Sequence, residues 1–305
     1  MNQLPLNSPT SAKGTWRTYS LAEGLCGIQV EHIAEDHEGY LWFATYDNGV
    51  SRFDGDEFRT YTRTSGLCGN QVMCILSDSQ NRLWFATRDG GACWYDGQYF
   101  HKFTGSDNMA TGSVSYIAED RQGRIWFSGE TTLGFYENEV FHDLHPEYRR
   151  SLGGHPTTAD FFGCFGIAQD SQGHIWLASN PLTRYDGHAF KHYGPSAGLP
   201  TTGYSYSLAI DLNDNLWIGG EQTIGRLVDH SFYPEHLDVG AMMRKIEIDR
   251  EGRVWFCTAG RGVICYDGER FERLTVQDGL AYDMVNSAFE DREGHIWFST
   301  WGGGV

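Results

Sequence analysis

Residues 35–62 read EDHEGYLWFATYDNGVSRFDGDEFRTYT, and this stretch decides the fold because the chain repeats it. Its core, an aspartate followed six positions later by a tryptophan, recurs as DHEGYLWFAT, DSQNRLWFAT, DRQGRIWFSG, DSQGHIWLAS, DLNDNLWIGG, DREGRVWFCT and DREGHIWFST. The tryptophans are residues 42, 84, 126, 176, 217, 255 and 297, at spacings of 42, 42, 50, 41, 38 and 42. Short β-type runs and turn residues at this period are typical of a propeller with one four-stranded blade per repeat.

The first repeat also predicts the strands of one blade. Apolar alternation and turn residues place strands at about residues 30–35, 41–45, 50–53 and 57–61. Glycine or asparagine lies three positions before each tryptophan, with Asp214 as the exception, which predicts a left-handed backbone at that position. The aspartate of each repeat can accept hydrogen bonds from the amides of the turn that follows it. We therefore expect the repeated acids to be architecture.

These patterns predict an all-β fold, a single seven-bladed β-propeller over residues 15–305 with four-stranded antiparallel blades, after a polar N-terminal tail of residues 1–14. Residues 15–20 resemble the end of the first repeat, so we expect them to pair with the last blade as its fourth strand and to close the ring. The last repeat stops at STWGGGV, where a third strand should begin. Either residues 4–6 supply that strand or the natural chain continues past Val305, and we expect the second.

Composition excludes some classes of partner. The chain has 23 Lys+Arg against 40 Asp+Glu, a net charge of −17, which argues against nucleic-acid binding. No run of eighteen apolar residues is present, so we expect no membrane contact by this segment. The cysteines in apolar, strand-like runs are expected to be buried free thiols, at positions Cys74, Cys93, Cys164, Cys257 and Cys265. Free thiols favour the cytoplasm and an excised sensor domain would be periplasmic, so localisation stays open.

The phrase GLxxxxVxxIxxDxxGxLWFxTxxGGVxRYDGxxFxxY resembles the two-component regulator propeller repeat over about residues 15–305. Such propellers usually form the sensory part of larger bacterial signalling proteins, ahead of a histidine kinase, a diguanylate cyclase or a similar module. The resemblance implies a sensing or protein-contact domain with a covalently linked or associated output domain. The fold also looks like that of streptogramin lyase, which implies a metal-dependent lyase or hydrolase as the alternative. A protein-interaction scaffold is the second alternative.

Candidate binding residues occupy two symmetric positions around one mouth of the central channel. The fourth residue after each tryptophan varies between blades, as Tyr46, Arg88, Glu130, Asn180, Glu221, Ala259 and Trp301. The eleventh residue before each tryptophan is equally mixed, as Glu31, Met73, Ser115, Phe165, Tyr206, Arg244 and Asn286. Variation at symmetric positions lets a uniform scaffold recognise an asymmetric ligand, although free drift of exposed loop residues is the alternative.

From these positions we predict binding of a small molecule, with a carbohydrate as one candidate, or of a partner protein. Arginine can bind a carboxylate or phosphate, the glutamates can accept from hydroxyl groups, and the aromatic residues can stack on rings. A surface salt bridge between Arg88 and Glu130, and core packing of Tyr206, are the simpler alternatives. The predicted ligand-binding residues are Tyr46, Arg88, Glu130, Asn180, Glu221, Trp301, Glu31, Tyr206, Arg244 and Asn286.

Catalytic motifs are missing from the sequence. It contains no GxSxG, HExxH or phosphate-binding loop, and only His32, His145 and His155 could approach the channel mouth. The stretch DLNDN at 211–215 opens like a calcium loop but continues with Leu216 where that loop needs glycine. We therefore predict no enzyme, no cofactor and no metal site. An insertion within residues 142–160 could form a rim or lid over the channel mouth, or a plain solvated loop.

Overall fold

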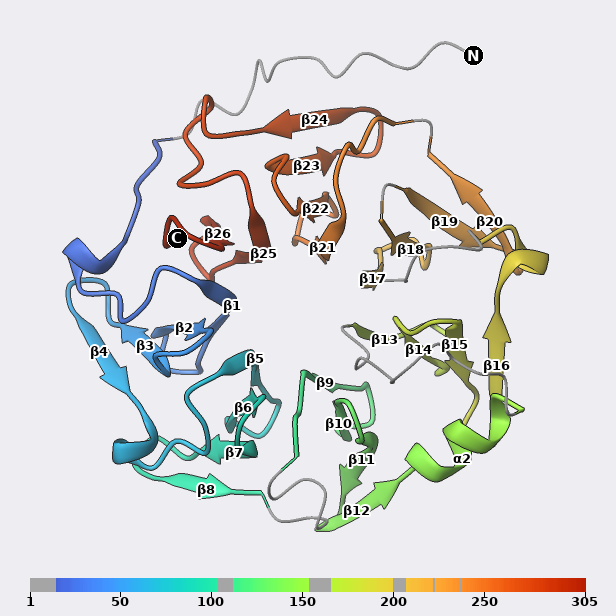
Figure 1. The fold of residues 1–305 in the computed structure, drawn as a ribbon, viewed down its shortest axis with the longest axis horizontal. Helices are drawn as coiled ribbons and strands as arrows, with labels where there is room; N and C mark the ends of the chain where they lie inside the picture. Colours follow the sequence, from blue (N-terminus) through green and yellow to red (C-terminus); the bar gives the residue numbers. More distant parts are fainter. Residues whose placement is uncertain (1–14, 104–111, 154–165, 200–206, 222, 236) are drawn as a thin grey trace.

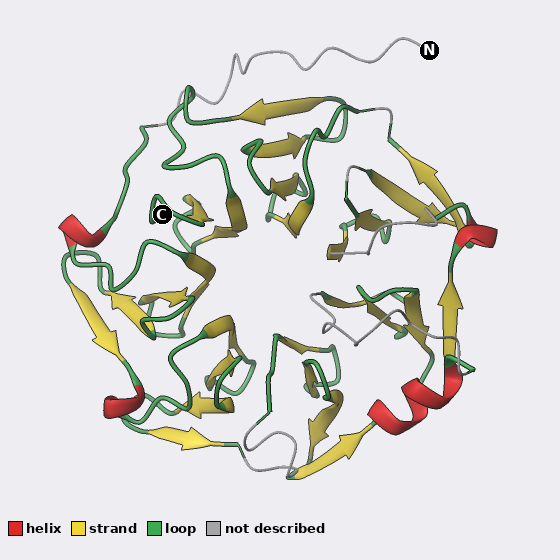
Figure 2. Cartoon of the chain, in the orientation of Figure 1, coloured by secondary structure: helices red, strands yellow, loops and turns green. Residues whose placement is uncertain are grey.

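The computed structural model describes residues 15–103, 112–153, 166–199, 207–221, 223–235 and 237–305. Small antiparallel sheets are arranged like spokes around a central axis, with the first strand of each sheet nearest the axis (Figure 1). The helical segments lie on the outer side of the ring (Figure 2). Among the described residues, no helix has the length and apolar character needed to cross a bilayer.

The four-stranded sheets are each built from four consecutive strands. They are β1 (Val30–Glu35), β2 (Leu41–Thr45), β3 (Val50–Phe53) and β4 (Phe58–Tyr61); β5 (Val72–Ser77), β6 (Leu83–Thr87), β7 (Gly91–Tyr95) and β8 (Phe100–Lys102); β9 (Tyr116–Glu119), β10 (Ile125–Ser128), β11 (Leu133–Glu137) and β12 (Val140–Asp143); β13 (Ile167–Gln169), β14 (Ile175–Leu177), β15 (Leu182–Tyr185) and β16 (Phe190–Tyr193); β17 (Ser207–Ile210), β18 (Leu216–Gly219), β19 (Ile224–Val228) and β20 (Ser231–Pro234); β21 (Met243–Ile248), β22 (Val254–Thr258), β23 (Val263–Tyr266) and β24 (Phe271–Leu274). The remaining elements are β25 (Val285–Glu290), β26 (Ile296–Thr300), α2 (His145–Ser151) and the short 3-10 helices η1 (Leu21–Glu23), η2 (Arg63–Ser65) and η3 (Pro195–Ala197).

The prediction of seven four-stranded blades is wrong. The described residues form six four-stranded blades, and the last sheet contains only β25 and β26. Residues 15–20 do not form the predicted fourth strand of that sheet. The reason is that this segment forms a ladder of only one residue pair with the end of the chain. Tyr19 and Val305 exchange backbone hydrogen bonds of 2.8 and 3.0 Å. An isolated pair does not extend into a strand.

Contacts at several depths still join the two-stranded sheet to the first blade. At the periphery, the ring of Tyr19 packs between Trp297 of β26 at 5.6 Å and Phe53 of β3 at 5.1 Å. Near the axis, Asn286 Nδ2 donates to the Val30 carbonyl at 2.8 Å. At the end of the channel opposite the mouth, the Arg292 amide donates to Glu35 at 2.7 Å. The ring is therefore closed by side chains as much as by backbone pairing.

The aspartate of each repeat holds both a turn and a tryptophan. Asp36 Oδ1 accepts from the amides of Glu38 and Tyr40 at 3.0 Å each, and Asp36 Oδ2 accepts from Trp42 Nε1 at 2.7 Å. The indole bond forms in all seven repeats at 2.7–2.9 Å. The third residue before each tryptophan has a φ between 63° and 95°, at Gly39, Asn81, Gly123, Gly173, Asp214, Gly252 and Gly294. The predicted left-handed turn is confirmed, and the repeated acids have structural partners.

The tryptophans pack successive blades together. The ring of Trp42 is fully buried and lies 5.6 Å from both Phe85 and Tyr95 of the next blade. Trp84 makes the equivalent contacts one blade further on, at 5.5 Å from Phe127 and 6.2 Å from Tyr136. Because each ring fills the space between two sheets, apolar burial stabilises the ring as a whole rather than single blades.

The insertion after β12 begins with α2, which packs on the outer side of the ring (Figure 1). Tyr148 is fully buried there, with its ring 5.4 Å from Phe190 and 5.8 Å from His192. The described part of the insertion is thus a peripheral helix, because Tyr148 has an apolar site against β16. Residues 154–160 lie outside the described residues.

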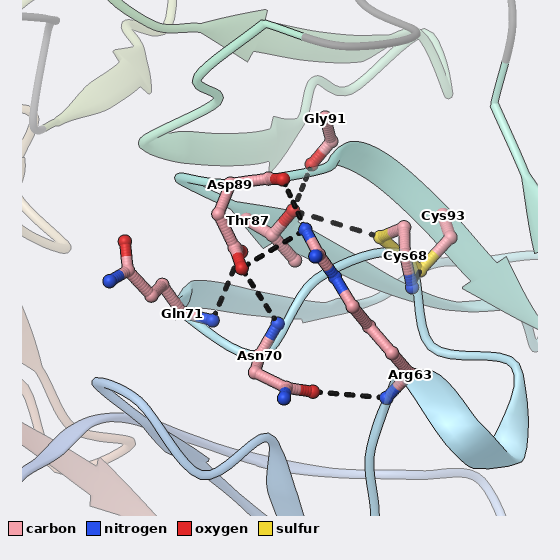
Figure 3. The surroundings of a disulfide bond; sticks show 8 residues. All are labelled: Arg63, Cys68, Asn70, Gln71, Thr87, Asp89, Gly91 and Cys93. Atoms are coloured by element: carbon pink, nitrogen blue, oxygen red, sulfur yellow. Dashed lines mark hydrogen bonds and ion pairs between the residues drawn. A yellow bond between two sulfur atoms is a disulfide. The ribbon is translucent and has the colours of Figure 1, made fainter.

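A disulfide contradicts part of the cysteine prediction. Cys68, in the link between β4 and β5, is bonded to Cys93 in β7, with the two Cα atoms 5.8 Å apart (Figure 3). Cys93 was expected to be free, but the link folds back over β7, and that contact cannot be read from strand periodicity. The free thiols among the described residues are Cys26, Cys74, Cys257 and Cys265, and Cys164 lies outside them.

Replacing Cys93 with serine should lower the free energy of unfolding by about 3 kcal/mol, because the cross-link restricts the unfolded chain. Serine fits the site, since the first blade has Ser51 there and its Oγ accepts from the Cys26 amide at 2.9 Å. Guanidinium unfolding with and without reductant measures the effect. Reductant should destabilise the wild type and the Cys26→Ser control, and leave Cys93→Ser unchanged. Equal sensitivity of all three proteins would contradict the cross-link.

Candidate functional site

Among the described residues, four innermost strands carry a β-bulge at the same place. The ladder to the second strand shifts register between Val30 and His32, and the equivalent shifts occur in β5, β21 and β25. A bulge inserts one unpaired residue and redirects its side chain. The bulged residues are Glu31, Met73, Arg244 and Asn286, which all belong to the predicted eleventh position before the tryptophan.

The bulged residues line a cavity of about 220 Å³ at the channel mouth. Every described residue of the eleventh position contributes to it, because Ser115 joins the four bulged residues. Phe165 and Tyr206, the other two predicted residues of this set, lie outside the described residues. The remaining lining residues are His32, Tyr116, Met242, Met243 and Lys245. The described residues of the position eleven before the tryptophan are therefore gathered around one cavity.

The position four residues after the tryptophan supplies a rim to this cavity from three neighbouring sheets. Tyr46 packs edge-on against Trp301, with ring centres 5.0 Å apart. Arg88 Nη1 donates to the Tyr46 hydroxyl at 3.2 Å. The guanidinium of Arg244 lies 5.3 Å from the centre of the Trp301 ring, so the rim and the cavity are continuous. We call Tyr46, Arg88, Trp301, Glu31, Arg244 and Asn286 the mouth cluster.

Three predicted residues belong neither to the lining of this cavity nor to its rim. Glu130, Asn180 and Glu221 are exposed and belong to the third, fourth and fifth blades. Within the described part of the chain, Arg88 forms no ion pair with Glu130 and instead contacts Tyr46. The alternative of a simple surface salt bridge is therefore wrong for Arg88. The mouth cluster is confined to one arc, formed by the first two blades, the sixth blade and the two-stranded sheet.

Glu31 is the electrostatically unusual member of the cluster. Its Oε1 is buried, and no hydrogen-bond partner is present for it among the described residues. Burial raises the pKa of the carboxyl to about 7, against the opposing charges of Arg244 and Arg88. Because the folded pKa lies above the unfolded value of 4.5, the favourable contribution to stability is complete below pH 4.5. It is lost as the pH rises through about 7, where the buried carboxyl ionises.

Lys245 lies below the bulge residues and reaches across the channel. Its Nζ contacts His32 Nε2 on β1 and forms an ion pair with Glu247 Oε1 at 2.6 Å. It also lies 5.4 Å from the ring centre of Tyr116 on β9. Burial alone would lower the pKa of Lys245, but Glu247 and the other neighbours together raise it above the usual 10.5. The cavity floor therefore carries a paired ammonium group.

His32 is the neutral partner of that ammonium. Burial and, to a smaller extent, the Lys245 charge lower its pKa well below the usual 6.5. Sequence reasoning placed His32 near the mouth but missed Lys245. The pattern MRKIEI at 243–248 held a usable signal, because a lysine and a glutamate two positions apart in a strand share one face.

No group of three or more histidine, cysteine, aspartate or glutamate side chains that could hold a metal is found among the described residues. The mouth cluster can instead make charge-assisted hydrogen bonds through its arginines and stacking contacts through its aromatic rings. This chemistry suits recognition of a small polar molecule at the channel mouth.

Comparison with family models supports the sequence resemblance. The model described as "Two component regulator propeller" matches residues 24–47, 66–89, 108–131 and 279–302. Each match ends a few residues after a repeat tryptophan, so the motif includes the turn that presents the rim residue. The predicted resemblance to this repeat family is confirmed.

Solved structures share the fold at low sequence identity. The extracellular domain of a hybrid two component system from B. thetaiotaomicron matches with a TM-score of 0.77 and 20% identity, over 94% of this chain and 41% of that chain. A second extracellular domain from B. thetaiotaomicron, of a one component system, matches with a TM-score of 0.73 and 18% identity, over 95% and 39%. Virginiamycin B lyase from Staphylococcus aureus, with quinupristin, matches with a TM-score of 0.71 and 16% identity, over 94% and 95%.

The chain spans about two fifths of the length of these two extracellular domains. A search of curated proteins found no match. At such identities the structural likeness establishes the fold alone, which the two extracellular domains and the lyase have in common.

Proposed function

We propose that this propeller is the sensory input module of a bacterial two-component or related signalling protein, and that it binds a small molecule at the channel mouth. A carbohydrate is one candidate ligand, and a partner protein is the alternative occupant. The observation that carries the proposal is the cavity of about 220 Å³, which five sheets line with residues that differ from blade to blade. Uniform scaffold residues surround it, so the variation is concentrated where a ligand would touch.

Two further observations support the proposal. The regulator propeller repeats at 24–47, 66–89, 108–131 and 279–302 are of a type named for two-component regulators. The Cys68–Cys93 disulfide is of the kind that persists in oxidising compartments, where the input side of a sensor meets its signal. We therefore propose an exported location for this module.

The proposed mechanism is a shift between ring arrangements. A ligand in the cavity would contact β1, β21 and β25 together, and β25 belongs to the two-stranded sheet that lies between the sixth blade and the first. Binding would therefore favour one packing of these sheets over another. The ligand can shift that equilibrium only by the difference in its affinity for the two arrangements.

Replacing Arg88, Arg244 and Trp301 together with alanine should abolish ligand binding. Thermal shift assays against a panel of sugars, sugar acids and amino acids measure it. A ligand present at a hundred times its Kd stabilises the wild type by about 2.7 kcal/mol, which raises the Tm by several degrees. The triple variant should show no shift with the same compound.

The control for this experiment is Glu251→Gln, in an exposed turn at the opposite end of the channel, which should respond like the wild type. Ligand-free Tm values of the triple variant and the wild type should agree within a few degrees, because Arg88 is exposed and Arg244 and Trp301 are only half-buried. If no compound shifts the wild type, or if shifts persist in the triple variant, the channel mouth is not the binding site.

A further inference from the structure

The guanidinium of Arg244 is held in one orientation. Its Nε donates to Asn286 Oδ1 at 3.0 Å, and Asn286 Nδ2 donates to the Val30 carbonyl at 2.8 Å. Asn286 is almost fully buried, at 4% exposure, which fixes its amide. Trp301 lies against the guanidinium at 5.3 Å. The two terminal nitrogens of Arg244 make no hydrogen bond within the described residues, so they are available as a fork for a planar anion.

Glu31 lines the same cavity, and one oxygen of its carboxyl group has no partner among the described residues. Its Oε1 is buried and makes no hydrogen bond among the described residues. A buried polar oxygen without a partner is costly in a folded protein, and binding of a ligand is one way to satisfy it. The cavity thus presents an oriented cationic fork and an unsatisfied carboxyl group side by side.

We propose that the cavity binds a small hydroxylated carboxylate, with the ligand carboxylate on the Arg244 fork and a ligand hydroxyl on Glu31. This proposal rests on the ligand-binding function proposed above and names the chemical class for that same site. The volume of about 220 Å³ equals roughly seven waters of liquid, which suits one compact molecule. Trp301 at the rim offers a flat surface for the carbon skeleton.

The charges that face Glu31 favour this class. Arg244 on β21 and Arg88 on the β6–β7 turn are both cationic, which favours an anionic ligand. The Lys245 ammonium is already paired with Glu247, and His32 is neutral. A ligand carboxylate near Glu31 is tolerated while Glu31 carries its proton, and the protonated carboxyl can donate to a ligand hydroxyl oxygen. Glu31 therefore recognises the ligand hydroxyl as a neutral donor, and Arg244 binds the ligand carboxylate through its cationic fork.

Isothermal titration calorimetry with three compounds of similar size tests the class. D-Glucuronate has a carboxylate and hydroxyls, D-glucose lacks the carboxylate, and cyclohexanecarboxylate lacks the hydroxyls. At pH 6 we expect D-glucuronate to bind at least tenfold more tightly than either of the others. Arg244→Lys keeps the charge but loses the fork, so it should weaken D-glucuronate binding at least tenfold. Glu251→Gln, at the opposite end of the channel, should leave the affinity unchanged.

The pH dependence provides a second readout that a general loss of structure would not imitate. Glu31 ionises through a pKa of about 7, and a ligand carboxylate is anionic throughout this range. The D-glucuronate affinity should therefore fall about tenfold between pH 6 and pH 8, as expected when one proton is retained on binding. Glu31→Gln, which stays neutral, should remove most of this fall.

Three results would overturn the inference: equal or tighter binding of D-glucose, no binding of D-glucuronate, or an affinity that rises with pH. If a neutral compound binds and the triple variant of Arg88, Arg244 and Trp301 loses it, the proposed function stands and only the ligand class is wrong. If binding persists in the triple variant, both proposals fail.

Discussion

Trp84→Ala should lower the free energy of unfolding by about 4 kcal/mol. The side chain has no exposed surface and fills the space between two blades, with Phe103, Phe127 and Tyr136 around it at 5.6, 5.5 and 6.2 Å. Alanine would leave a cavity there. It would also remove the indole N–H that donates to Asp78 at 2.8 Å, in a site where Asp78 is 5% exposed. Guanidinium unfolding followed by far-ultraviolet circular dichroism measures the loss.

Trp94→Ala is the matched control for this prediction. Trp94 lies in the same blade and stacks on His101 at 4.1 Å, but it is only half-buried. Its removal should cost about 1 kcal/mol, in line with the smaller apolar area taken from water. Similar losses for Trp84 and Trp94 would show that burial between blades is not what stabilises the ring.

Glu247→Ala should be about as destabilising, by about 4 kcal/mol, because it leaves the buried Lys245 ammonium without its carboxylate. The Nζ–Oε1 distance is 2.6 Å, and the Lys245 side chain is only 10% exposed. The pKa of Lys245 lies above its usual 10.5, so its stabilising contribution is complete below pH 10.5. That contribution is lost only as the pH rises through the still higher folded pKa. Urea unfolding at pH 7 therefore measures the charged pair.

The opposite substitution should be much milder. Lys245→Met fills the same space, and the Glu247 side chain, at 32% exposure, can be hydrated when its partner is gone. We expect a cost of about 1 kcal/mol. Glu251→Ala, which loses only a 3.4 Å surface contact to Arg253, should cost less than 1 kcal/mol. A Lys245→Met loss equal to that of Glu247→Ala would contradict this asymmetry.

The repeat made the local structure predictable. The sequence predicts the first three strands at 30–35, 41–45 and 50–53, and β1, β2 and β3 have these bounds. It also predicts the left-handed residue before each tryptophan and the variable position that turns out to be the bulge. All of these features depend on contacts within one repeat. Because the repeat occurs seven times, a structural feature predicted from one copy can be compared with the sequence of the other six.

The features that sequence reasoning missed depend on contacts between distant parts of the ring. Lys245 and His32 are 213 residues apart in the sequence, and they are in contact because Lys245 reaches across the central channel. The Cys68–Cys93 bond depends on how a link folds over a strand. The mouth cluster depends on contacts between sheets, since Arg88 contacts Tyr46 of the first blade and Trp301 lies against Arg244 of the sixth. Periodicity carries no information on these contacts.

The bulges have a consequence for protein engineering. A bulged residue is skipped by the ladder, so Val30 and His32 keep their partners Thr45 and Ala44 on either side of Glu31. An exchange at that position leaves the pairing pattern of the sheet intact. Residues 31, 73 and 244 can thus be varied together while the pairing of the sheet is kept, whereas Asn286 is best retained because its side chain holds the Val30 carbonyl. The recognition properties of the mouth can therefore be changed by single substitutions at the bulged positions, without altering the strand pairing.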